Sequence, residues 1–218
     1  MRPLLLDLFC GAGGAAVGYH RAGFDVIGVD LNPQPHYPYQ WVQADALKVL
    51  TAMIENGLSA FSAIHASPPC QAYTTTAGSR KRSDHPDLIN PVRELLEMTG
   101  LPWVIENVPG ALYKMREPIV LCGATFGLPV IRHRLFETNW GLRGHDPQCP
   151  VQTKFGSAVF HGPQYVAYAR GTWEPRWRRE VLPVVWPWMT VAESGQAIPP
   201  AYTEYVGQQL LMQIQSKA

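Results

Sequence analysis

The first 30 residues restrict the possible folds more than any other part of the sequence. Residues 4–9 form a short apolar run that leads into a glycine-rich turn at residues 11–14. Residues 14–22 then suit a helix, and residues 24–29 form a second apolar run that ends at Asp30. This order is typical of a βαβ unit, in which an acid after the second strand meets ribose hydroxyls. The start of the chain therefore predicts a parallel sheet with a binding site at the strand ends.

The alternation of strands and helices continues along the chain. Further helices are expected at residues 45–56, 88–99 and 202–214, and further strands at residues 61–67, 103–106 and 133–137. We therefore expect an α/β fold with an open, mostly parallel, Rossmann-like sheet and helices on both faces. The pattern is lost from Gly141 to Trp188. This loss predicts a core domain at 1–140 and 187–218, with a small irregular insertion at 141–186.

The composition indicates no dominant partner. The 218 residues include 18 Lys and Arg against 17 Asp and Glu, so the formal net charge is +1. The low charged fraction of 16% excludes charge-driven disorder, and the small net charge leaves room for local concentrations of charge. The four cysteines form no C-x-x-C pair, and His145 with Cys149 has no second pair to complete a zinc site. We therefore expect neither a disulfide framework nor a metal.

The sequence also predicts where the protein acts. No apolar run approaches the length of a membrane span, and Asp7 interrupts the apolar segment that follows Arg2. A secretory signal or a membrane anchor is therefore not expected. The simplest expectation is a soluble, cytoplasmic monomer without a membrane partner.

The glycine-rich turn allows three interpretations. Gly11, Gly13 and Ala16 nominally satisfy the dinucleotide pattern that binds NAD or FAD. A fold that binds S-adenosylmethionine uses the same physics, because glycine lets the backbone approach the ligand closely. A tight turn that binds nothing is the third interpretation. The turn alone does not choose between them.

Cys70 is a candidate nucleophile because of its position. Pro68 and Pro69 directly follow a predicted strand, and they end it because proline fixes φ and has no backbone N–H. Ligands in open α/β sheets bind at the carboxyl ends of strands, where a thiol can act as a nucleophile. A buried structural thiol is the alternative.

Three charged side chains are expected near this cysteine. Glu106 ends the next predicted strand, where a carboxyl group can protonate or hydrogen-bond a ring nitrogen. Arg132 and Arg134 are two residues apart on a predicted strand, so their guanidinium groups should share one face. Such groups suit a carbonyl oxygen, a phosphate or a carboxylate. Exposed side chains without a role are the alternative.

Taken in order, these segments resemble the DNA (cytosine-5)-methyltransferase family. The matching segments are residues 7–14, Pro68-Pro69-Cys70-Gln71, Glu106-Asn107-Val108, Arg132-x-Arg134 and Gly195-Gln196-Ala197-Ile198-Pro199-Pro200. Each segment alone is a weak to moderate signal, whereas five of them in the family's order are specific. The compact, Trp-rich chain is also similar to small phage-encoded members, which would place it in the host cytoplasm.

The resemblance implies a reaction on a cytosine flipped out of double-stranded DNA. By motif match, Cys70 would attack carbon 6 as the thiolate, and Glu106 would hold ring nitrogen 3 and the exocyclic amine. Arg134 would contact the base carbonyl, and Arg132 would position the site near Cys70. Carbon 5 would then take a methyl group from S-adenosylmethionine, with S-adenosylhomocysteine as the product.

The resemblance also implies how the cofactor is held. Phe9 would lie against the adenine, Asp30 would take the ribose hydroxyls and Asp45 would accept from the adenine amine. Pro69 would line the cofactor side of the pocket. The remaining cofactor-binding residues are those of the turn, namely Gly11, Gly13 and Gly14.

Basic residues are concentrated in two segments that could contact nucleic acid. They are Arg80, Lys81 and Arg82 after the nucleophile, and Arg170, Arg176, Arg178 and Arg179 beside Trp173 and Trp177 in the insertion. Guanidinium groups bind phosphates and aromatic rings stack on bases, so contact with DNA is expected. A solvated charged face and a packed tryptophan cluster are the alternatives.

The sequence departs from the family pattern in three places. Val130 stands where the family usually has Gln, Gln196 stands where it usually has Asn, and the insertion is short. A short insertion predicts a recognition site of about two to four base pairs, since each good bidentate contact discriminates by about 1–3 kcal/mol. It also leaves open the same reaction on RNA or a free cytosine nucleotide. A non-catalytic binding protein is the third possibility.

Overall fold

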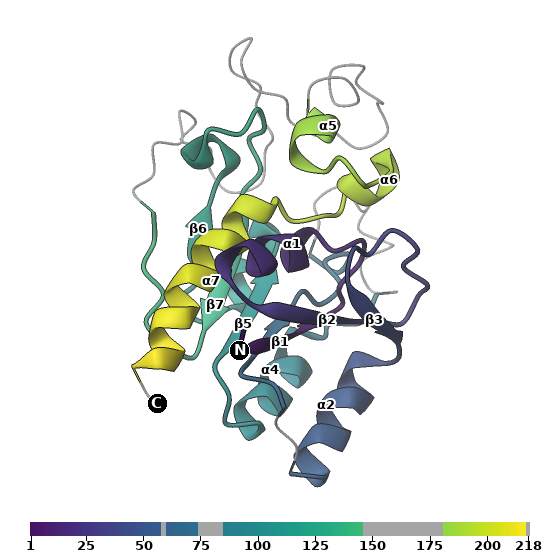
Figure 1. The fold of residues 1–218 in the computed structure, drawn as a ribbon, viewed down its shortest axis with the longest axis vertical. Helices are drawn as coiled ribbons and strands as arrows, with labels where there is room; N and C mark the ends of the chain where they lie inside the picture. The colour runs from purple at the N-terminus through teal and green to yellow at the C-terminus, as the bar shows by residue number, and fades with distance from the viewer. Residues whose placement is uncertain (58–59, 74–84, 146–180, 217–218) are drawn as a thin grey trace.

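A seven-stranded sheet forms the centre of the molecule, with the strand order β3-β2-β1-β4-β5-β7-β6 (Figure 1). The computed structural model describes residues 1–57, 60–73, 85–145 and 181–216. The strands are β1 (Leu4–Leu8), β2 (Asp25–Asp30), β3 (Gln40–Gln43), β4 (Ala63–Ala66), β5 (Trp103–Asn107), β6 (Ile119–Leu121) and β7 (Arg134–Thr138). Pairing is parallel from β3 through β5, whereas β7 pairs antiparallel with both β5 and β6.

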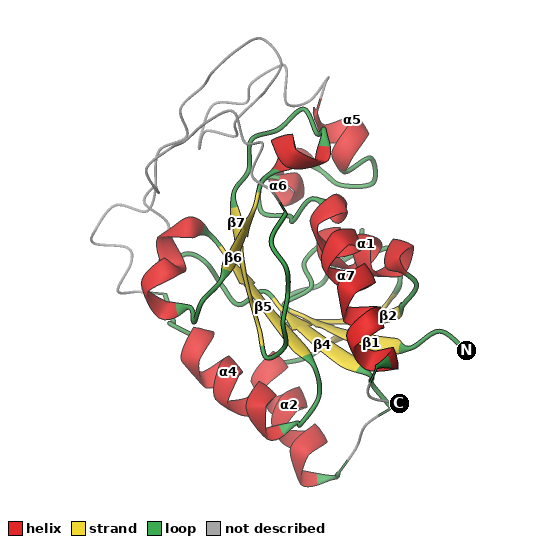
Figure 2. Ribbon diagram, turned by 90° about the vertical axis from the view of Figure 1, so that its left-hand side faces the viewer, coloured by secondary structure: helices red, strands yellow, loops and turns green. Residues whose placement is uncertain are grey.

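Helices cover both faces of this sheet (Figure 2). On one face lie α1 (Gly14–Ala22) and α7 (Pro200–Gln215), which pack against each other; on the other lie α2 (Ala46–Glu55) and α4 (Ile89–Met98). Short helices follow, namely η1 (Pro109–Lys114), η2 (Gly123–Phe126), α5 (Leu182–Val185) and α6 (Val191–Ser194). The expected open, mostly parallel α/β fold is therefore confirmed.

The core has one apolar cluster on each side of the sheet. Leu6, Ile64 and Ile105 pack on the side of α2 and α4. Leu5 and Val104 pack on the other side, under α1 and α7. Consecutive residues on a strand point to opposite faces, and strands buried on both faces therefore read as continuous apolar runs.

Every helix and strand expected from the sequence is confirmed, with ends that move by up to two residues. The antiparallel direction of β7, the short edge strands β3 and β6, and the short helices were not predicted. Within the expected insertion, Val181, Val185 and Trp186 pack against Ala12 and Val130 of the core. Residues 146–180 of the insertion lie outside the described residues, so the domain boundary stays a prediction.

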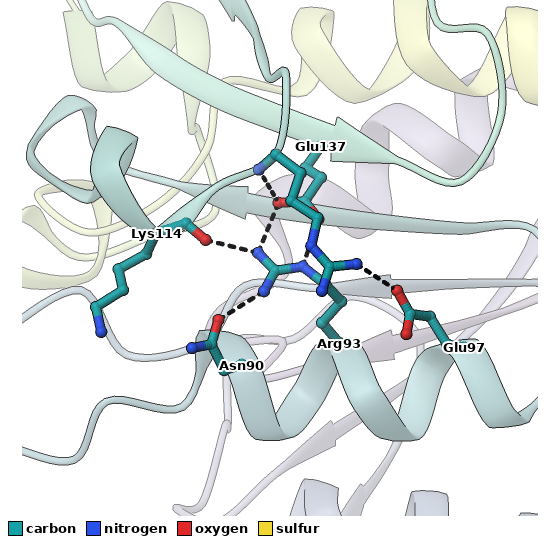
Figure 3. Close-up of polar contacts among 6 residues, drawn as sticks. Asn90, Arg93, Glu97, Lys114 and Glu137 are labelled. Carbon is teal, nitrogen blue, oxygen red and sulfur yellow. Dashed lines mark hydrogen bonds and ion pairs between the residues drawn. The ribbon is translucent and has the colours of Figure 1, made fainter.

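A buried ion pair ties β7 to α4 on the side of the sheet away from α7 (Figure 3). The Arg93 and Glu137 side chains are only 3% and 2% exposed, and Nε of Arg93 lies 2.5 Å from Oε1 of Glu137. Arg93 Nη2 also donates to Oε2 of Glu137 at 2.8 Å and to the Lys114 carbonyl at 2.7 Å. A paired charge with satisfied donors is the form in which arginine tolerates burial. The pair fixes the strand that begins at Arg134.

Within the described ranges, no helix has the length and apolar character of a membrane span.

Candidate active site

A cleft of about 710 Å³ opens at the carboxyl ends of the parallel strands. Its lining combines the glycine-rich turn and the residues after β2 with the segment around Cys70 and with Glu106. These elements are far apart in sequence, but a parallel sheet brings the carboxyl ends of its strands to one edge. Of the residues expected to be catalytic or to bind the cofactor, those that line the cleft are Phe9, Gly11, Gly14, Asp30, Asp45, Pro69, Cys70, Glu106 and Arg134.

The glycine-rich turn has a backbone that only small residues allow. Gly13 caps α1 with φ at 84°, and a Cβ there would lie 2.6 Å from Pro38. A Cβ on Gly14 would lie 2.4 Å from the Ile198 carbonyl oxygen, so the turn closely approaches residues 195–200, which we call the late motif. Phe9 also has a positive φ, at 58°. A non-glycine residue in this region is strained, and such strain concentrates at functional sites.

Asp30 and Asp45 both line the cleft and also have structural roles. Asp30 accepts hydrogen bonds from the backbone N–H groups of Gly11, at 3.0 Å, and Asn32, at 2.9 Å. It thereby holds the turn in place at the edge of the cleft. Asp45 caps α2, and both of its cap bonds use Oδ1, which leaves Oδ2 for a ligand.

Asp7 is a site residue that the sequence reasoning missed. It lines the cleft, is 1% exposed and accepts from the Tyr37 hydroxyl through Oδ2 at 3.2 Å. Its Oδ1 is buried without a hydrogen-bond partner in the described chain. Burial raises the pKa of Asp7 well above its ordinary value. An acid inside an apolar strand was the available signal, because such a side chain needs a partner.

Cys70 lines the cleft, on a turn that is held by the end of β5 and by a backbone bond of its own. The Asn107 side chain donates to the Pro68 carbonyl at 2.9 Å, and the Tyr73 N–H donates to the Cys70 carbonyl at 2.9 Å. Burial raises the pKa of the Cys70 thiol, an effect that Arg134 opposes and Glu106 reinforces. The thiol is therefore protonated at neutral pH in the free protein.

Glu106 and Arg134 form an ion pair beside this thiol. Nε of Arg134 lies 3.0 Å from Oε1 of Glu106, and the two side chains are 12% and 7% exposed. That oxygen accepts no hydrogen bond from the described residues. Burial raises the pKa of Glu106, while Arg134, Ser67 and Arg132 act in the opposite direction. The cleft thus holds a carboxyl group whose pKa depends on its neighbours, and its Oε1 is available to accept from a ligand.

Arg132 precedes β7 and has different partners from Arg134. Its Nη2 donates to the Gly195 carbonyl at 2.7 Å, and its guanidinium group lies 5.7 Å from the Trp186 ring centroid. Arg132 lies before the strand and not on it, because β7 begins only at Arg134, but both guanidinium groups act on Cys70 and Glu106. Burial, and the like charge of Arg134, lower the pKa of Arg132 to about 9. Arg132 thus connects the loop before β7 to the late motif.

Two tryptophans join the late motif to the cofactor side of the cleft. Nε1 of Trp186 donates to the Ile198 carbonyl at 3.0 Å, and Nε1 of Trp188 donates to the Ala12 carbonyl at 2.8 Å. Gln196 lines the cleft, whereas Val130 is buried in the apolar cluster around Trp186. The two single-residue departures from the family pattern, Val130 and Gln196, therefore lie beside or in the segment that carries the late motif.

The residues expected to contact nucleic acid lie outside the described residues; they are Arg80, Lys81, Arg82, Arg170, Arg176, Arg178 and Arg179. In the part of the chain that is described, no three His, Cys, Asp or Glu side chains form a metal-binding group.

The fold and the cleft define an α/β protein with a thiol and a carboxyl group in one cleft at the carboxyl ends of its parallel strands. A family model described as C-5 cytosine-specific DNA methylase matches residues 4–121, which is more than half of the chain. The chain belongs to this family, and it is a DNA cytosine-5-methyltransferase by that membership. Cys70 and Glu106 lie inside the matched region, whereas Arg132 and Arg134 lie beyond it.

Individual relatives are distant. The type II methyltransferase M.AquIA of Picosynechococcus sp. is 26% identical over 247 residues, covering 92% of this chain and 91% of that relative. M.AplI of Arthrospira platensis is 27% identical over 163 residues, covering 63% of this chain and 46% of that relative. The solved structure of the methyltransferase EhMeth of Entamoeba histolytica has 18% identity and a TM-score of 0.45, covering 66% and 57% of the two chains. The chain thus spans most of M.AquIA but only about half of the other two.

Proposed function

We propose that the protein methylates carbon 5 of a cytosine that is flipped out of duplex DNA, with Cys70 as the nucleophile. The observation that carries the proposal is the convergence of Cys70, Glu106 and Arg134 in one cleft with the glycine-rich turn. A protein that only bound DNA would need neither a thiol on a rigid turn nor a buried carboxyl group beside it.

Cys70 forms a bond to carbon 6 as the thiolate, which makes carbon 5 electron-rich. Glu106 holds ring nitrogen 3 and the exocyclic amine, and so stabilises the charge that develops on the ring. Arg134 contacts the base carbonyl while it holds Glu106, and Arg132 positions the pair from the side of Gly195. Once carbon 5 carries the methyl group, it loses its proton to a water molecule. The electrons of that C–H bond re-form the ring double bond, and the bond between Cys70 and carbon 6 breaks to release the thiolate.

The cleft suits S-adenosylmethionine, which supplies an electrophilic methyl group when it is bound. The buried, unpartnered Oδ1 of Asp7 fits an ammonium group, because a cation would compensate the buried carboxylate. Asp30 takes the ribose hydroxyls, Asp45 takes the adenine amine through Oδ2, and Phe9 lies against the ring. Gly11, Gly13, Gly14 and Pro69 complete this side of the pocket.

DNA is bound by the basic residues after Cys70 and in the insertion, through its phosphates. We propose that residues 141–186 read the bases, and that their small number limits the site to about two to four base pairs. The protein acts as a monomer in the cytoplasm, the host cytoplasm if it is encoded by a phage.

The test separates the substrates. The protein is incubated with labelled S-adenosylmethionine and, in separate reactions, with duplex DNA, RNA or dCTP, and the product base is identified. Labelled 5-methylcytosine in DNA is expected, whereas product in RNA or dCTP alone would refute the proposal. A 5-fluorocytosine duplex should trap a covalent adduct in the wild type and in Cys122→Ala, since Cys122 is buried away from the cleft. An adduct in Cys70→Ala would show that another residue is the nucleophile.

A further inference from the structure

Behind Glu106, a line of polar side chains leads away from the cleft into the interior of the sheet. Ala66 of β4 pairs with Ile105 of β5, so Ser67 and Glu106 are the next neighbours along these strands. The Ser67 side chain hydrogen-bonds the Glu106 carboxyl group. Residues two apart on a strand share a face, and His65 therefore lies on the same side as Ser67.

His65 continues the line as far as α1. Its Nε2 lies 2.8 Å from the Ser67 hydroxyl oxygen, and its Nδ1 lies 2.9 Å from the hydroxyl oxygen of Tyr19. Both His65 and Tyr19 are 0% exposed. A histidine inside an α/β core is costly unless both ring nitrogens are satisfied, and here both of them are.

The protonation states of these groups fix which of them donates and which accepts in each hydrogen bond of the line. Burial lowers the pKa of His65 to about 3, so the ring is neutral, with one nitrogen that donates and one that accepts. Burial also raises the pKa of Tyr19, which keeps its proton. An ionised Glu106 can only accept, so Ser67 donates to it, Nε2 of His65 donates to Ser67 and Tyr19 donates to Nδ1.

The reverse direction leaves one proton without a partner. If Glu106 donated to Ser67, the order would invert as far as Tyr19, whose hydroxyl would then need an acceptor. No second acceptor for Tyr19 is found among the described residues, although the Asp7 charge acts on Tyr19 from β1. The line of hydrogen bonds therefore favours the ionised form of Glu106 and opposes the rise in its pKa that burial causes.

The other charged and titratable groups around Glu106 lie elsewhere. Arg134 and Arg132 act on it from β7 and the loop before it, and the Cys70 thiol lies on the cleft side. Ser67 is the neutral donor in this set. A neutral donor can orient the Glu106 carboxylate without changing the balance between its negative charge and the positive charges of Arg134 and Arg132.

We infer that Ser67, His65 and Tyr19 are positioning residues for the proposed reaction, which act through Glu106 by fixing its carboxyl group and biasing its proton. This role rests on the proposed function, because it matters only if Glu106 holds the base. It assigns a task to a buried histidine and a buried tyrosine that never reach the substrate. Networks of this kind influence a reacting group most strongly where the surroundings exclude water.

The direct test follows the Glu106 carboxyl carbon by NMR in protein with 13C-labelled glutamate, with the signal assigned by its absence in Glu106→Gln. Ser67→Ala should move the titration midpoint to higher pH, because it removes a donor to the ionised form. Ser67→Thr keeps the hydroxyl and should restore the wild-type midpoint. Tyr19→Phe should move it in the same direction by less. The matched control Tyr205→Phe, whose hydroxyl donates to the Arg143 carbonyl, should not move it.

A double variant separates a connected line from two independent defects. In the Ser67→Ala background, Tyr19→Phe should have no further effect on the midpoint, since its influence passes through Ser67. Additive shifts, or an unchanged midpoint in Ser67→Ala, would overturn the inference. The titration needs no turnover, so its result is independent of the labelling assay that tests the proposed function. If the proposed function and this inference are both correct, Ser67→Ala should lower kcat about tenfold with little change in KM for S-adenosylmethionine.

Discussion

Replacing Glu137 with glutamine should destabilise the protein more than any exposed charge substitution. Glu137 accepts from Nε and Nη2 of Arg93 at 2.5 and 2.8 Å, and from the Arg116 N–H at 2.8 Å. Glutamine keeps the shape but removes the charge, and its NH₂ group would face a guanidinium N–H. Arg93 would remain 2% exposed with only Asn90 and the Lys114 carbonyl as acceptors.

Breaking a buried pair by removing one partner costs about 3–5 kcal/mol. Because two acceptors for Arg93 survive, we expect the lower end, about 3 kcal/mol. That is a large share of a typical unfolding free energy of about 5–15 kcal/mol. For a chain of this length it corresponds to a decrease in Tm of about 6–12 °C.

The measurement is urea unfolding of the wild type and Glu137→Gln, followed by circular dichroism, with calorimetry for Tm. Glu97→Gln is the matched control, because the Arg116–Glu97 pair is 66% and 47% exposed and should contribute less than about 1 kcal/mol. In the double variant Arg93→Met, Glu137→Leu, no charge is left unpaired, so it should be more stable than Glu137→Gln. A loss below about 1 kcal/mol in Glu137→Gln would refute the reasoning.

Three further predictions concern the cleft. Alkylation of Cys70 by iodoacetamide, followed by mass spectrometry, should be slow at neutral pH and should accelerate as the pH rises through and above the usual pKa range of thiols, because burial raises the pKa of Cys70. Arg134→Ala should slow the alkylation further, since Arg134 opposes this rise. Fast labelling at pH 7 would contradict the prediction. Glu106→Gln should lower kcat about 10²–10⁴-fold in single-turnover assays while S-adenosylmethionine still binds; a loss under tenfold would exclude an acid–base role. Asp30→Asn should weaken cofactor binding about tenfold by calorimetry, because it loses a charged acceptor for Gly11 and for the ribose; unchanged affinity would contradict the assignment.

The elements that could be predicted from the sequence are those whose burial pattern is local. Residues 14–22 form α1 over the expected range, because glycines bound the helix at Gly13 and Gly23. The edge strand Gln40–Gln43 pairs with one strand only and has no buried residue, so no burial pattern marks it in the sequence. The direction of β7 depends on its pairing with β5, a contact between segments about 30 residues apart that no local pattern contains.

The candidate site could be predicted in part for the same reason. Cys70 and Glu106 stand at strand ends, and a parallel sheet brings strand ends together whatever the intervening sequence. Asp7 and His65 lie within strands, where a lone polar residue gives no indication of its partner. Tyr19 and His65 are 46 residues apart, and only the packing of α1 on β4 makes them neighbours.

Val130 tests whether a departure from the family pattern is a defect. It is 1% exposed and packs in the apolar cluster with Ala12 and Trp186, beneath the turn that holds the cofactor side of the cleft. Restoring the usual residue with Val130→Gln would bury an amide among apolar side chains, at a cost of about 1–3 kcal/mol for the unsatisfied group, with overpacking in addition. We therefore expect a lower Tm and weaker S-adenosylmethionine binding, measured by calorimetry, whereas Val130→Ile should change both less. Higher activity with an unchanged Tm would show instead that the site lacks a group that glutamine supplies.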